Sequence, residues 1–110
     1  QPSIIMTIEG SDAPEEIVVL GGHADSITME RGHEDKRSPG ADDNASGIAS
    51  VTEVIRLMME NNLKPKKTVQ FMAYAAEEIG LVGSDDIAKK YKKAKKNVIG
   101  VMQLDMTLFK

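Results

Sequence analysis

The chain has 110 residues, a formal net charge of −3 and no cysteine. This length allows one domain at most, and the lack of cysteine excludes a disulfide framework and a thiolate zinc site. The net charge gives no electrostatic reason to expect nucleic acid or an acidic membrane as a partner. No apolar run approaches the length of a membrane span.

The first half of the sequence predicts two strands, a loop and a helix. Residues 3–9 predict a partly alternating strand, and residues 17–20 form an apolar run typical of a strand covered on both faces. The turn residues between these runs predict that the two strands are antiparallel neighbours. Residues 25–41 show no periodicity and predict a long loop. Residues 43–62 carry apolar side chains at three-and-four spacing, which predicts an amphipathic helix.

The second half predicts a strand, a helix and a final strand. Residues 68–74 are mostly apolar, and Ser84 is a candidate N-cap for a helix that runs to about Lys96. Residues 98–104 predict the last strand. Strands separated by helices indicate an α/β fold, with a mixed, mostly parallel sheet of about four strands and two crossover helices. We interpret residues 1–110 as a single, partial domain.

One histidine and several carboxylates stand where these predicted elements begin or end. Parallel strands bring their carboxyl ends to one edge of the sheet, so these side chains should converge there. Imidazole nitrogen with carboxylate oxygens suits Zn²⁺, and Mn²⁺ or Co²⁺ less specifically. Clustered carboxylates need a cation nearby to stay ionised. One metal ion would leave some of them without a cation, so two metal ions that share a bridging carboxylate account better for the whole set. The residues are His23, Asp25, Asp42, Glu77, Glu78 and Asp105.

Each of these residues also has an ordinary explanation when it is taken alone. An aspartate that opens a helix often caps it, and we expect this of Asp43. We interpret His33 as a solvated loop residue, and the lysines between residues 89 and 96 as a solvated helix face. The ordered set at element boundaries is a stronger indication of a metal site than any single member.

Four sequence motifs stand out: GGHADS at residues 21–26, PGADDNASG at residues 39–47, AYAAEEIG at residues 73–80 and LDM at residues 104–106. They resemble motifs of peptidase family M28, in particular of its bacterial secreted leucyl aminopeptidases. The resemblance covers essentially the whole chain and implies the zinc-peptidase α/β fold. It also implies zinc-dependent hydrolysis of the N-terminal peptide bond of peptides, with leucyl-type preference, and a secreted or extracellular location.

The resemblance implies a role for each site residue. His23, Asp42 and Asp105 would bind one zinc ion. Asp42 would bridge to a second zinc ion that Glu78 also binds. Glu77 would be the general base that activates water.

The resemblance implies two supporting residues as well. Asp25 would orient His23, and Asp43 would support the site without binding metal. The peptide bond between Asp42 and Asp43 would be cis. Asn44 stands where relatives commonly carry a third aspartate, a change that removes no ligand.

Relatives have a catalytic domain well over twice this length, and their second histidine ligand would follow Lys110. We therefore expect the N-terminal part of such a domain, with the Glu78 zinc one ligand short. The start at Gln1, with no signal peptide, suggests a processed product or an excised fragment. An exposed apolar edge would favour a homo-oligomer. The alternatives are a non-catalytic metal-binding fragment, or another M28 chemistry such as a carboxypeptidase or a glutaminyl cyclase.

Overall fold

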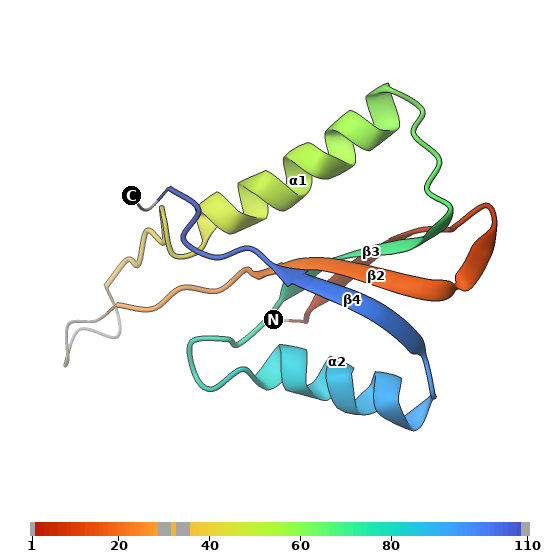
Figure 1. The fold of residues 1–110 in the computed structure, drawn as a ribbon. Helices are drawn as coiled ribbons and strands as arrows, with labels where there is room; N and C mark the ends of the chain where they lie inside the picture. The colour runs from red at the N-terminus through yellow and green to blue at the C-terminus, as the bar shows by residue number, and fades with distance from the viewer. Residues whose placement is uncertain (1, 29–31, 33–35, 109–110) are drawn as a thin grey trace.

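The fold is described from a computed structural model that covers residues 2–28, 32 and 36–108; His33 lies outside the described residues. The sheet lies between two helices, with α1 over one face and α2 over the other (Figure 1). This arrangement confirms the predicted α/β class. The elements are β1 (Ile4–Ile8), β2 (Ala13–His23), α1 (Ala45–Glu60), β3 (Lys67–Tyr74), α2 (Val82–Lys93) and β4 (Asn97–Gln103).

The strand order in the sheet is β1-β3-β2-β4. β2 pairs in parallel with β3 and β4, whereas β1 pairs antiparallel with β3. The predicted pairing of the first two strands is therefore wrong, because β3 lies between them. The segment between β1 and β2 does not form a hairpin turn, because its backbone bonds to the residues just before β3. Ser11 N donates to the carbonyl of Pro65, and Asp12 N donates to that of Lys66.

The core is built on the two central strands, β2 and β3. Successive strand residues face opposite sides of the sheet, so Met72 contributes to the α2 side and Phe71 to the α1 side. Both are almost fully buried, as is Val51 of α1. Burial of such a side chain contributes about 1.5–3 kcal/mol. The buried cluster on the α2 side consists of Ile17, Val19, Met72 and Tyr74, with Ile87, Tyr91 and Val98 packed against it.

Helix α1 begins two residues later than predicted. Its N-cap is Asn44, whose side-chain oxygen accepts a hydrogen bond from Gly47 N at 3.0 Å. The prediction that Asp43 caps the helix is therefore wrong. An asparagine satisfies a free N–H at a helix start as well as an aspartate does, so composition alone does not choose between them.

Helix α2 begins earlier than predicted, at Val82, and ends earlier, at Lys93. Leu81 precedes it in a left-handed conformation, and no side chain caps the helix. Ser84, the predicted cap, instead donates to the carbonyl of Leu81. The turn that contains Glu78 thus leads almost directly into α2. Neither helix of the described part of the chain has the length and apolar character needed to cross a membrane.

Candidate metal centre

Five side chains converge at one edge of the sheet, where the parallel strands end. His23 is the last residue of β2, Glu77 and Glu78 lie in the turn after β3, Asp105 follows β4, and Asp43 lies just before α1. Donor atoms of His23, Asp43 and Asp105 lie within 4.8 Å of one another, as do those of His23, Glu77 and Glu78. This is the convergence that the strand-end positions predict.

The imidazole of His23 is at the centre of both groups and is 1% exposed. Its Nδ1 lies 3.0 Å from the carbonyl oxygen of Asp25, which can only accept, so Nδ1 carries the hydrogen. Its Nε2 lies 2.9 Å from Oδ1 of Asp43, 3.5 Å from Oδ1 of Asp105 and 3.9 Å from Oε2 of Glu77. A neutral ring would direct its lone pair at these oxygens. The arrangement therefore needs a proton or a metal ion between them.

The pKa shifts of His23 and Glu78 also indicate that the cluster needs additional positive charge. Burial on its own would lower the pKa of His23. The attraction of the Asp105 carboxylate, with smaller effects of the other acidic neighbours, outweighs burial and raises this pKa. Burial, followed by repulsion from Asp43 and Glu77, raises the pKa of Glu78. Both shifts reduce the net negative charge of the cluster. A divalent cation would have the same effect.

The donor set around His23 fits zinc. Ligand atoms about 2.1 Å from a tetrahedral zinc ion lie roughly 3.4 Å apart. The distances from His23 Nε2 to Asp43 and Asp105, 2.9 and 3.5 Å, lie on either side of that value. One imidazole nitrogen with two carboxylate oxygens also leaves one tetrahedral position open, as catalytic zinc sites do.

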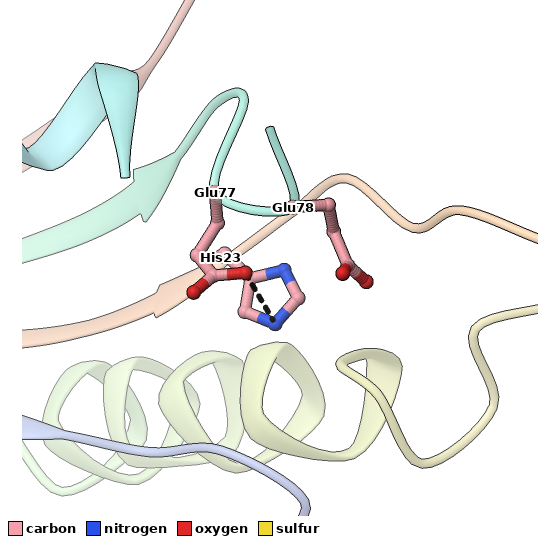
Figure 2. Close-up of side chains that lie close together, drawn as sticks. All are labelled: His23, Glu77 and Glu78. Carbon is pink, nitrogen blue, oxygen red and sulfur yellow. Dashed lines mark ion pairs between the residues drawn. The ribbon is translucent and has the colours of Figure 1, made fainter. Parts of the chain in front are cut away.

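The second group is formed by the Glu77–Glu78 turn. Figure 2 shows both glutamates reaching from this turn toward the ring of His23, the last residue of β2. The side chain of Glu77 is 27% exposed. Both glutamates are thus only partly buried, and Oε2 of Glu77 lies 3.9 Å from His23 Nε2.

Asp42 does not belong to either group of possible metal ligands among the described residues. Its Oδ1 instead accepts hydrogen bonds from Leu108 N and Ser46 Oγ, each at 3.1 Å. Asp43 faces His23 in its place. The cis peptide bond likewise joins Asp43 to Asn44, not Asp42 to Asp43. In the structure, Asp43 and not Asp42 lies beside His23. The two aspartates are adjacent where the predicted helix begins, and the sequence pattern does not distinguish them.

Asp25 contacts the site in two ways. Its main-chain carbonyl bonds to His23, whereas its carboxylate oxygen is 3.7 Å from that ring nitrogen. The two carboxylate oxygens accept from Glu77 N at 3.0 Å and Glu78 N at 3.1 Å. Partial burial on its own would raise the pKa of Asp25. The hydrogen bonds from Glu77 and Glu78, with the other local contacts, outweigh burial and lower this pKa. The side chain thus holds the Glu77–Glu78 turn, a contact that the sequence analysis missed.

Two further polar residues at the start of α1 were also missed. Asn44 and Ser46 are buried, at 2% and 6% exposure. Both bond to the segment that follows β4. In the sequence they are recognisable only as residue types that commonly cap a helix. That pattern does not predict hydrogen bonds to residues about 60 positions away.

The profile of peptidase family M28 matches residues 3–110. The chain belongs to this family. A probable aminopeptidase of Saccharomyces cerevisiae is 46% identical over 111 aligned residues, which are 97% of this chain and 29% of that protein. Leucine aminopeptidase 1 of Arthroderma otae is 45% identical, again over 97% of this chain and 29% of that protein. This M28 chain thus spans under a third of the length of these curated relatives.

Solved structures agree with the fold of this M28 chain. LapB from Legionella pneumophila superposes with a TM-score of 0.79 at 35% identity, over 96% of this chain and 27% of LapB. BSAP, a zinc aminopeptidase from Bacillus subtilis, gives a TM-score of 0.77 at 30% identity, over 94% of this chain and 24% of BSAP. The mixed sheet and its two helices are therefore those of zinc aminopeptidases.

Proposed function

We propose that this chain forms the metal-binding part of a zinc-dependent aminopeptidase, which hydrolyses the N-terminal peptide bond of peptides. The observation that carries the proposal is the His23 ring, whose Nε2 faces carboxylates from two other segments. A preference for leucyl-type residues is part of the proposal, supported by the names of relatives such as leucine aminopeptidase 1.

In this proposal, His23, Asp43 and Asp105 would hold one zinc ion. Glu78, together with Asp43, would hold a second. The assignment of Asp43 in place of Asp42 rests on its 2.9 Å approach to the His23 ring. Zinc, when bound, supplies Lewis acidity that polarises a peptide carbonyl and makes water more acidic.

Glu77 is the general base of the proposed reaction. Its side chain is partly exposed, and its carboxylate lies 3.9 Å from His23 Nε2. There it takes a proton from water and returns it to the leaving amine. Asp25 keeps Glu77 in place, because it accepts the Glu77 N–H at 3.0 Å.

The proposal is tested with the 110-residue chain, zinc and a chromogenic leucyl amide. We expect chromophore release that requires zinc, stops on addition of a chelator and is lost in Glu77→Gln. Zinc binding should survive in that variant. The matched control is Glu15→Gln, which alters an exposed glutamate of β2 and should leave release unchanged.

Three outcomes would reject the proposal in different ways, the first in this assay and the other two in product analysis with peptides. Zinc bound at His23 without any release would leave a non-catalytic metal-binding fragment. Release from peptides blocked at the N-terminus, but not from those blocked at the C-terminus, would indicate a carboxypeptidase. Release of ammonia from the side-chain amide of an N-terminal glutamine, whose α-amine closes the ring, would indicate a glutaminyl cyclase.

We also propose that the chain associates with itself through the edge of the sheet at β4. Val101 and Met102 of this strand are 65% and 60% exposed, and exposed apolar edge strands promote association. Light scattering at high protein concentration should report a mass above that of one chain. A clean monomer would contradict this part of the proposal.

A further inference from the structure

We propose that Asn44 is a positioning residue that fixes Asp43 relative to Asp105, through one side-chain amide that bonds on both sides of Asp105. The inference rests on the zinc site proposed above. It concerns how this chain sets the distance between two ligands that come from distant parts of the sequence.

The contacts of the Asn44 amide carry the inference. Its Nδ2 donates to the carbonyl of Leu104 at 2.9 Å, and its Oδ1 accepts from Met106 N at 3.3 Å. Leu104 and Met106 are the residues on either side of Asp105. The same Oδ1 accepts from Gly47 N at 3.0 Å, which caps α1. Because Asn44 directly follows Asp43, one planar group connects the backbones that carry both carboxylates.

Burial makes these contacts specific to an amide. Asn44 is 2% exposed, so its polar atoms cannot exchange their partners for bulk water. Among the described residues, no buried side-chain nitrogen or oxygen lacks a hydrogen-bond partner. The Leu104 carbonyl needs a donor and the Met106 and Gly47 N–H groups need an acceptor. A carboxamide supplies both within one side chain.

Two glycines make room for this contact. A Cβ atom at Gly22 would lie 3.0 Å from the Leu104 carbonyl and 3.2 Å from Asn44 Nδ2. A Cβ atom at Gly47 would overlap both Asn44 Oδ1 and the Leu104 carbonyl. The lack of a side chain at Gly47 is therefore required for this contact, and a side chain at Gly22 would crowd it.

Further bonds join the same two segments. Thr107 N donates to Ser46 Oγ at 2.9 Å, and Leu108 N donates to Asp42 Oδ1 at 3.1 Å. The start of α1 therefore holds the chain from Leu104 to Leu108 at several successive points. Such bonds fix the separation of the two ligand carboxylates before metal binds, which reduces the ordering cost of binding.

The test compares Asn44→Ser with the wild-type chain, using Co²⁺ as the probe. Serine still caps a helix, but its short side chain cannot reach both Leu104 and Met106. We expect Co²⁺ affinity to fall about tenfold or more, the scale seen when groups behind metal ligands are altered. We also expect a changed Co²⁺ visible absorption spectrum, which reports the arrangement of the ligands. The circular dichroism spectrum should stay that of a folded chain.

Asn61→Ser is the matched control. It makes the same change at the other end of α1, where the exposed Asn61 side chain donates to the carbonyl of Leu57 at 2.8 Å. Both the Co²⁺ affinity and the spectrum of this variant should equal those of the wild type.

Wild-type affinity and spectrum in a folded Asn44→Ser chain would overturn the inference and reduce Asn44 to a helix cap. Failure of the wild-type chain itself to bind Co²⁺ would instead overturn the proposed metal site, and this inference with it. If Asn44→Ser does not fold, hydrogen exchange of the Asn44 side-chain amide in the wild type decides. Slow exchange without metal supports the inference, and fast exchange overturns it.

Discussion

The two helices cover opposite faces of one sheet, but only α1 contributes buried residues next to the candidate metal centre. Its first turns contain buried residues and bond to the segment after β4. Helix α2 has no buried residue, and an apolar hollow of about 460 Å³, lined by Val19, Met72 and Tyr91 among others, lies between it and the sheet. We infer that α1 positions ligands whereas α2 covers the sheet. Equivalent substitutions should therefore have larger effects on the α1 side.

The largest effect is expected from Gly47→Ala. In a helix interior this change normally stabilises by up to about 1 kcal/mol, but here the added Cβ would overlap Asn44 and the Leu104 carbonyl. We expect a loss of about 3 kcal/mol in the free energy of unfolding, the upper end for overpacking. Urea denaturation measures it.

Gly100→Ala in β4 is the control for that prediction. A Cβ at Gly100 meets nothing within 4 Å, so the free energy of unfolding should change by no more than about 0.5 kcal/mol. Equal losses in the two variants would contradict the claim that close contacts at the start of α1 exclude a side chain at Gly47.

The next largest effect should separate the two neighbouring aspartates. Asp43→Asn removes a carboxylate that lies 2.9 Å from His23 Nε2, and we expect zinc affinity to fall about 100-fold, or roughly 2.7 kcal/mol. Asp42→Asn keeps an oxygen that can accept from Leu108 N, so its affinity should stay within about threefold, or roughly 0.7 kcal/mol. Competition with a chromogenic chelator measures both. The reverse order would restore Asp42 as the ligand.

A smaller effect is expected from Asp25→Asn. An amide can accept only one of the two N–H bonds that Asp25 now receives from Glu77 and Glu78. The variant leaves a partly buried donor unpaired, which costs about 1–2 kcal/mol in the free energy of unfolding. Turnover should fall because the general base loses its support. Thermal denaturation and chromophore release measure the two consequences.

The control for Asp25→Asn lies on α2. Asp86→Asn removes an exposed ion pair with Lys90, and surface pairs of this kind contribute about 0.2–0.5 kcal/mol. If Asp86→Asn lowered the free energy of unfolding as much as Asp25→Asn, the two hydrogen bonds of Asp25 would contribute no more to stability than an exposed ion pair.

The sequence predicts the order of the elements and the strand-end positions of His23, Glu77, Glu78 and Asp105. These features depend on local apolar runs and on where those runs stop. The neighbour of β1 and the choice between Asp42 and Asp43 were not predictable in this way. They are decided by hydrogen bonds between distant segments, such as that from Met106 N to Asn44, 62 residues apart.

The smallest effect is expected from Tyr91→Phe on α2. The tyrosine hydroxyl donates to Gln70 Oε1 at 2.7 Å, and loss of one such bond costs about 0.5–1 kcal/mol in the free energy of unfolding. Zinc affinity should not change, because α2 does not support the ligands. A measurable fall in zinc affinity, by the same chelator competition, would show that the two sides are coupled.

The most direct test of the account is anomalous scattering at the zinc edge from crystals grown with zinc. We predict a peak bounded by the ring of His23 and the carboxylates of Asp43 and Asp105. A peak beside Asp42, or these side chains splayed apart with no peak between them, would contradict the account.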